Sequence, residues 1–241
     1  MSARAAGPGE FEARLAAPGG DRVFVRLQAG ALRVEDEDGR LRRDIHLDDV
    51  REVARQDTGV TLEIDRGGAL VLHSDRADAL DAAVLSACCT IPELTRALRS
   101  LGSSRLSAGG AAQREFFAPL LDARRRAEES VGRAAIVRAF DPDRLGRALD
   151  SYLGGLVERS GDGRPAARRA FAAQVEEAAE PLRAALERVR RVAGRAAEPV
   201  GDRRVSSWRA WAAALHDLFD AADRCWRSLH AVAAAGHELK S

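Results

Sequence analysis

The chain has 241 residues, of which 46% are hydrophobic and 31% charged, and its formal net charge is +1. This composition is typical of a globular protein that buries one large core or two ordinary ones without disulfide or metal staples. It excludes a long disordered chain, and no apolar run approaches the ~18–20 residues of a membrane-spanning helix.

The first ten residues, the cysteines and the amino-acid bias indicate the cellular setting and the genome of this protein. Residues 1–10 have no apolar stretch of the kind found in secretory signals, so we expect a short lead-in. The cysteines are a vicinal pair, Cys88 and Cys89, and a distant Cys225, which predicts buried thiols in a reduced, cytoplasmic setting and no disulfide framework. Lys240 is the only lysine and asparagine is absent, as expected from a GC-rich bacterial genome, so the preference for arginine carries no functional weight.

Charge is divided unevenly along the chain. Residues 1–102 contain 14 arginines against 18 acidic residues, a net of −4, and the remainder contains 24 basic against 19 acidic residues, a net of +5. Neither part is basic enough to indicate nucleic-acid binding by itself.

From Phe11 to Leu72 apolar residues alternate with polar ones, which is the period of half-buried strands. Turns rich in Gly, Pro and Asp separate the predicted strands, and Asp38-Gly39 is a strong hairpin signal. The predicted strands are Phe11–Leu15, Val23–Leu27, Leu32–Glu35, Leu41–Leu47, Val50–Val53, Val60–Ile64 and Leu70–Leu72. They predict an antiparallel meander or partly open barrel with one apolar face.

Two helices are predicted to follow the strands. The first, Asp78–Cys89, carries Leu80, Val84, Leu85 and Cys88 on one side and is expected to cover the sheet. A capping box at Thr90 and Glu93 begins a second, short helix, whose stripe is Leu94, Leu98 and Leu101.

Seven strands in hairpin order closed by a helix resemble the pleckstrin-homology-like superfold, including its bacterial members, over about residues 10–90. In those domains the first hairpin loop often carries clustered basic residues that bind phosphoinositides. Here residues 16–22 contain only Arg22, next to Asp21, and the tryptophan typical of the closing helix in many eukaryotic members is absent. The resemblance therefore implies the family's other common use, which is docking a peptide or protein along the open sheet edge or beside the helix.

The Ser/Gly/Ala stretch 103–110 reads as a linker between a β-rich module, 1–102, and a helical module, 111–241. In the second module apolar residues recur every three or four positions, which predicts packed amphipathic helices. The predicted helices are Ala112–Phe140, Pro142–Arg159, Pro165–Ala197, kinked near Pro181, and Ser206–Glu238. The fold class is therefore α+β, with an antiparallel four-helix bundle in which the short second helix leaves a notch.

Sequence motifs for chemistry are few. No Glu-x-x-His pair of a di-iron bundle occurs, and His216, Asp223, His230 and His237 recur every seven residues, ~10.5 Å apart along a helix, too far apart to share one metal. No nucleophile elbow, phosphate-binding glycine loop or dinucleotide fingerprint is present. We therefore expect no metal, no cofactor and no enzymatic activity.

Two sets of residues are candidates for binding. Trp208 and Trp211, near the start of the last helix, are core residues or part of an exposed partner groove, since tryptophan is enriched at binding hot spots. Arg188, Arg190, Arg191 and Arg195 form the densest basic cluster and are candidates for anion binding.

These patterns favour a non-enzymatic, cytoplasmic interaction or scaffold protein that binds a protein partner through the sheet edge or the bundle groove. The first alternative is a peripheral binder of anionic membranes or nucleic acid that uses the basic third helix of the bundle. The second is an enzyme with a pocket between the modules.

Overall fold

The computed structural model describes residues 9–15, 20–28, 30–89, 110–130, 132–159, 165–198 and 204–238, without the side chains of 233–238. It divides the chain into two compact units, 1–90 with 198–209 and 91–197 with 210–241. The predicted second module was 111–241, whereas this division groups 198–209 with the first unit. Residues 103–109 of the expected linker and the short helix after Thr90 lie outside the described residues.

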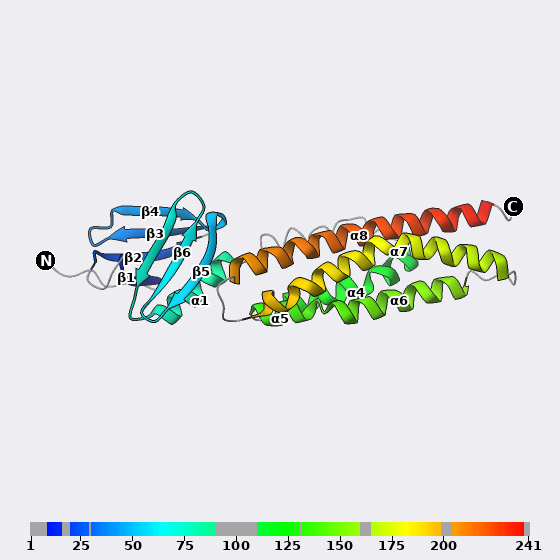
Figure 1. The fold of residues 1–241 in the computed structure, drawn as a ribbon, viewed down its shortest axis with the longest axis horizontal. Helices are drawn as coiled ribbons and strands as arrows, with labels where there is room; N and C mark the ends of the chain where they lie inside the picture. Colours follow the sequence, from blue (N-terminus) through cyan, green and yellow to red (C-terminus); the bar gives the residue numbers. More distant parts are fainter. Residues whose placement is uncertain are drawn as a thin grey trace. The chain divides into compact units, whose positions relative to one another are not determined.

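The first unit contains a seven-stranded antiparallel sheet with the order β4-β3-β2-β1-β7-β6-β5 (Figure 1). Its strands are β1 Glu10–Leu15, β2 Arg22–Gln28, β3 Ala31–Asp36, β4 Leu41–His46, β5 Val50–Gln56, β6 Gly59–Ile64 and β7 Gly68–His73, with a 3-10 turn η1 at Leu47–Asp49. All seven predicted strands are confirmed. Pairing of β1 with β7 joins the two halves of the meander, and β4 and β5 are the two edges, so the sheet is open.

Alternating valines and leucines form the core of this unit. Val23, Val25, Val60 and Leu62 are fully buried, as their period of two requires. The helix α1, Ala77–Cys88, lies against β5 and β6 and buries Leu80 among them (Figure 1). The predicted covering helix is therefore confirmed, and a sheet with a helix on its apolar side satisfies the α+β prediction.

The second unit contains α4 Ala111–Glu128, α5 Arg133–Ala139, α6 Pro142–Arg159, α7 Pro165–Ala197 and, from residue 210 onward, α8 Arg204–Glu238. The second and third predicted helices have the observed bounds. The first, Ala112–Phe140, is wrong as a single helix: it divides into α4 and α5 around Gly132, whose φ of 85° and ψ of 152° lie outside the helical region. Because only glycine adopts this backbone readily, Gly132 forces the break.

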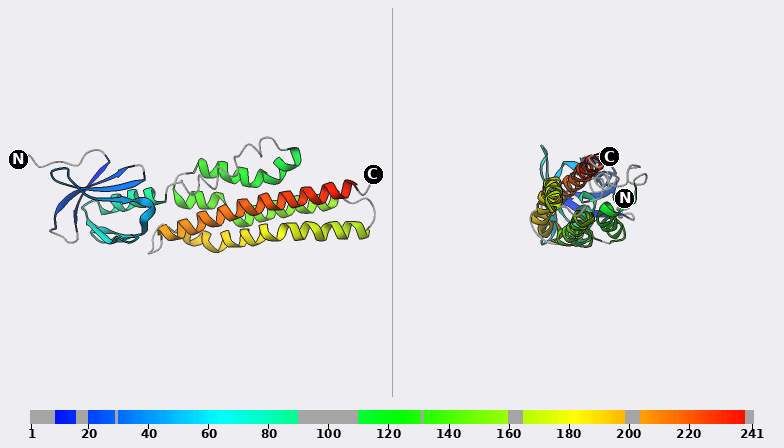
Figure 2. Two further views of the ribbon diagram at one scale, coloured as in Figure 1. Left: turned by 90° about the horizontal axis from the view of Figure 1, so that it is seen from above. Right: turned by 90° about the vertical axis from the view of Figure 1, so that its right-hand side faces the viewer.

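Aromatic side chains fill the interior of the second unit. Phe116 of α4 packs edge-on against Tyr152 of α6, with ring centroids 5.4 Å apart, and lies 5.6 Å from Trp226 of α8. Phe140, which ends α5, packs edge-on against Trp211 of α8 at 6.1 Å. Helices α7 and α8 run side by side (Figure 2). No helix among the described residues is both long enough and apolar enough to cross a membrane.

Candidate functional site

The start of α8 bonds to the β5 edge of the sheet at Val53. Arg204 donates hydrogen bonds from Nη1 and Nη2 to the two carboxylate oxygens of Asp81 in α1, the first at 2.8 Å, and Nη2 also donates to the carbonyl of Val53 at 3.0 Å. Arg204 and Asp81 are only 6% and 9% exposed. Hydrogen bonding to Asp81 raises the pKa of the Arg204 guanidinium.

Glu52 of β5 caps α8 from another part of the chain. Its carboxylate accepts hydrogen bonds from the backbone N–H of Val205 at 2.8 Å and from the N–H and hydroxyl of Ser206 at 3.3 and 2.8 Å. The same carboxylate accepts the N–H of Val53 at 3.3 Å. A carboxylate at a helix N-terminus accepts hydrogen bonds from the free N–H groups of the first turn and interacts favourably with the helix dipole. With Arg204 on its carbonyl and Glu52 on its N–H, both polar backbone groups of Val53 on this edge are bonded.

The opposite edge, β4, pairs only with β3 among the described residues. At its two ends Leu47 donates its N–H to the carbonyl of Gly30 and Asp36 donates to that of Arg40. Because antiparallel backbone groups alternate in direction, the N–H and C=O of Asp44 and His46 face away from β3. This edge therefore presents the N–H and C=O of Asp44 and the N–H of His46, while the C=O of His46 begins the 3-10 turn Leu47–Asp49.

The side chains of β4 are exposed apart from that of Ile45, and the exposed ones are polar except for Leu41. The pairing shifts between Val34 and Glu35, so Arg42 is an extra, bulged residue, and it pairs with Asp36 at 3.1 Å. Asp44 lies 3.6 Å from Arg33. Arg40 and Arg43 are exposed and have no side-chain partner among the described residues. Leu41, 53% exposed, is the one exposed large hydrophobic residue of the described chain.

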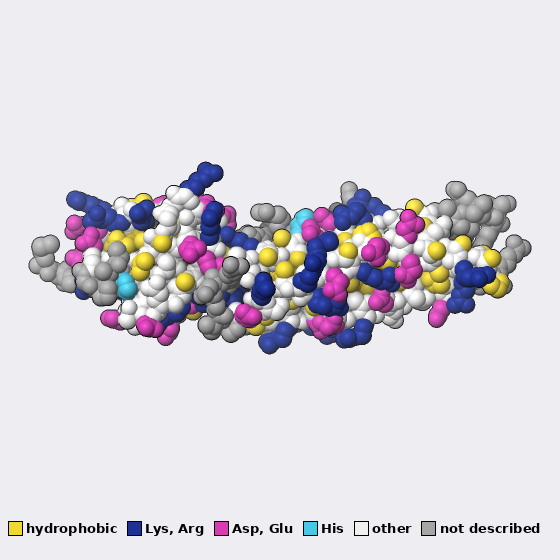
Figure 3. All heavy atoms as spheres, viewed as in Figure 1, with side chains coloured by type: hydrophobic (Ala, Val, Ile, Leu, Met, Phe, Trp, Pro, Cys, Tyr) yellow, Lys and Arg dark blue, Asp and Glu magenta, His cyan; other side chains and the backbone are white. Residues whose placement is uncertain are grey.

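Other charges on the sheet are matched across strands. Arg22 of β2 donates to both carboxylate oxygens of Glu12 of β1, at 2.7 and 2.9 Å, and this holds the pKa of Glu12 below its ordinary value. Arg26 of β2 pairs with Glu10 of β1, and its Nε and Nη2 both donate to Oε1. Figure 3 shows basic and acidic side chains interspersed over the face in view. The unpaired arginines beside β4 are therefore an exception on this sheet.

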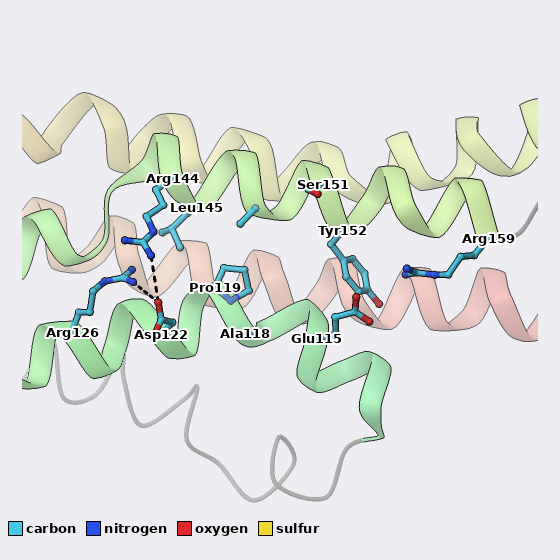
Figure 4. Close-up of a pocket in the computed structure, with 11 residues that line it drawn as sticks. Glu115, Ala118, Pro119, Asp122, Arg126, Arg144, Leu145, Ser151, Tyr152 and Arg159 are labelled. Atoms are coloured by element: carbon cyan, nitrogen blue, oxygen red, sulfur yellow. Dashed lines mark hydrogen bonds and ion pairs between the residues drawn. The ribbon is translucent and has the colours of Figure 1, made fainter.

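The second unit contains a groove between α4 and α6 with a volume of about 550 Å³. Its floor consists of Ala118, Pro119, Leu145 and Ala148. Arg126 and Arg144 lie with Asp122 at one end, and Glu115, Tyr152 and Arg159 lie at the other (Figure 4).

Charge at the first end of the groove is unbalanced. Asp122 accepts from Arg125 at 2.8 Å and from Arg126, and lies 3.7 Å from Arg144. Hydrogen bonding from Arg125 holds the pKa of Asp122 below its ordinary value. One carboxylate thus faces three guanidinium groups.

The two tryptophans considered as binding residues, Trp208 and Trp211, do not lie on the surface. Trp208 and Trp211 are 1% and 0% exposed, so the interpretation as core residues is confirmed, and the alternative of an exposed partner groove is wrong. The physical reason is that both positions lie on the apolar side of α8, where the large indole rings are buried.

The predicted basic cluster is partly neutralised. Arg188 lies 3.6 Å from Asp217 of α8, and Arg190 bonds Asp143 of α6, with Nε at 3.0 Å, as well as Glu187. Arg191 and Arg195 are exposed and unpaired among the described residues. Two of the four candidate side chains therefore remain free to meet an anion.

The histidines and cysteines do not assemble into a site within the described part of the chain. His216 lies 3.6 Å from Asp220, and His230 stacks on Trp226. No group of three or more metal-ligating side chains occurs among the residues searched. Burial raises the pKa of the Cys88 thiol to about 12, and that of Cys225 to about 11.

Sequence reasoning missed the buried charges Glu52, Asp81 and Arg204. A signal was present for one of them, because Asp81 falls on the same helical face as Leu80 and Val84, where a carboxylate needs a partner. Nothing in the local sequence identifies Arg204, 123 positions later, as that partner. Comparison with known proteins finds no matching family model, no matching curated protein and no matching solved structure.

Proposed function

We propose that this protein is a non-enzymatic, cytoplasmic interaction protein whose sheet, laid out like a pleckstrin-homology-like module, adds a strand from a partner protein at β4. The observation that carries the proposal is the contrast between the two edges. At β5 the backbone groups of Val53 are bonded to Arg204 and Glu52, whereas at β4 both backbone groups of Asp44 and the N–H of His46 face away from the sheet.

Strand addition supplies affinity through main-chain hydrogen bonds and specificity through side chains. The free side chains beside β4 are Arg40 and Arg43, while Asp44 is engaged with Arg33. The partner segment is therefore an extended, acidic one. Arginines and a bulge are also the devices that keep sheet edges from pairing indiscriminately, and here they select for acidic strands against neutral or basic ones.

The test uses a fluorescently labelled peptide of alternating valine and glutamate, about eight residues long, the length of an ordinary strand. We expect its fluorescence anisotropy to rise on titration with the full chain. A version with lysine in place of glutamate should bind at least about tenfold more weakly, because Arg40 and Arg43 repel it.

His46→Pro tests the geometry, because the φ of His46 is already −65° and its N–H faces away from β3. This variant should fold normally and weaken the glutamate peptide about fivefold to tenfold through the lost hydrogen bond and the bulk of the ring. His46→Ala, which keeps the N–H, is the matched control and should bind like the unmodified chain. Equal affinity for the two variants, or no binding of any peptide, overturns the proposal.

A further inference from the structure

The groove between α4 and α6 combines an apolar floor with an excess of positive charge at one end. Ala118, Pro119, Leu145 and Ala148 make the floor, and Pro119 lacks the N–H that a regular helix would donate to the carbonyl of Glu115. The volume of about 550 Å³ lies in the ordinary range of small-molecule sites.

The polar groups of the groove are placed asymmetrically. At one end the carboxylate of Asp122 faces Arg126 and Arg144, a formal excess of one positive charge within the groove, and it also pairs with Arg125 outside the groove. Arg144 lies farthest from Asp122 of the three arginines, at 3.7 Å, and its side chain is 60% exposed, so it is the most available to a ligand.

At the other end Glu115 and Arg159 balance each other in sign, and the Tyr152 hydroxyl donates to the carbonyl of Ala112 at 3.2 Å. That hydrogen bond and the edge-on packing of Tyr152 on Phe116 fix the ring as a wall. Figure 4 shows the Asp122 cluster at one end of the apolar floor and Glu115 and Arg159 at the other. A ligand that satisfies both parts of the groove carries one negative group and an apolar body.

We propose that the α4–α6 groove binds small amphiphilic anions, with the negative head at Arg144 and Arg126 and the apolar body along the floor. This site is separate from the β4 edge and goes beyond the proposed function. A carboxylate or phosphate head accepts hydrogen bonds from guanidinium groups, and burial of the chain against the floor supplies the remaining affinity.

The test is a titration of the full ¹⁵N-labelled chain with octanoate, followed by amide chemical shifts, with acetate and octanol as matched probes at equal ionic strength. For a probe of about ten non-hydrogen atoms we expect a dissociation constant in the millimolar range. Acetate and octanol should each bind at least about tenfold more weakly, since each lacks one half of the ligand. Octyl phosphate separates a preference for phosphate esters from one for fatty acids.

Substitution of a basic and of an acidic member of the charge cluster should change the affinity for octanoate in opposite directions. Arg144→Gln should weaken octanoate about fivefold, whereas Asp122→Asn, which removes the competing carboxylate, should tighten it about twofold or more. Arg147→Gln, at an exposed position of the same helix outside the groove, is the control and should leave binding unchanged.

The proposal is overturned by three results. These are no octanoate shifts in α4 and α6, acetate binding as well as octanoate, or equal affinities of the Arg144→Gln and Arg147→Gln variants. Any of them would leave the Asp122 cluster as an ion-pair network that only joins helices. Failure here leaves strand addition at β4 standing, because the two tests share neither probe nor residue.

Discussion

Arg204 donates two hydrogen bonds to the carboxylate of Asp81 across 123 positions of the chain. Both side chains are buried in the first unit, and the pair fixes the first turn of α8 against α1 and β5. A buried ion pair is weak evidence for net stability, because desolvation opposes the attraction. Removal of only one of the two charges lowers stability, because the other charge stays buried without its partner. Single and double substitutions can therefore test the pair.

Arg204→Met should lower the free energy of unfolding by about 3–5 kcal/mol, since Asp81 would remain buried without its guanidinium partner. Urea denaturation measures the change. The double variant with Asp81→Leu should recover much of the loss, because neither charge is then left alone. Arg191→Met, at an exposed position of α7, is the control and should change stability little. A purely additive double variant would contradict the coupling.

Glu52→Gln should lower the free energy of unfolding by about 1–2 kcal/mol, because the carboxylate at the start of α8 becomes a neutral amide. The comparison is Glu63→Gln on β6, which is exposed and should be nearly neutral. Protection of backbone amides against hydrogen exchange should fall first at Val205 and Ser206, whose N–H groups bond to Glu52. Uniform exchange along α8 in both variants would show that Glu52 is no cap.

The thiols should be unreactive in the folded chain. With the pKa of Cys88 raised to about 12 by burial, only about one thiol in ten thousand is ionised at about pH 8. Cys89 and Cys225 are buried as well. We expect disulfide-exchange reagents such as Ellman's reagent to label native protein at least about a hundredfold more slowly than urea-unfolded protein. Rapid labelling of any native thiol would contradict this burial.

Two glycines should respond to alanine in opposite directions. Gly132→Ala should cost about 1–3 kcal/mol, because its φ of 85° is a glycine conformation. Gly154→Ala should stabilise by about 0.5–1 kcal/mol, since Gly154 lies inside α6 with open space around its Cβ position. Thermal unfolding of the two variants measures the difference, and a loss of stability at both positions would contradict the assignment.

Local sequence patterns were enough to predict most of the strands and helices of this protein. A period of two with Gly and Asp turns predicted all seven strands, and a period near 3.6 with prolines predicted the bounds of α6 and α7. These signals are local, because strand and helix patterns repeat over a few residues. The break at Gly132 was visible as a glycine, but an uninterrupted apolar stripe on both sides concealed it.

Tertiary structure decided where α8 begins, which unit residues 198–209 join and which sheet edge stays open. The predicted start at Ser206 moved to Arg204 because Glu52, 153 positions before Val205, supplies the cap. The same contacts bond the outward backbone groups of Val53 on β5. Burial of Trp208 and Trp211 was likewise settled by packing. Such long-range pairings depend on two distant side chains meeting in one buried place, and no local pattern encodes that meeting.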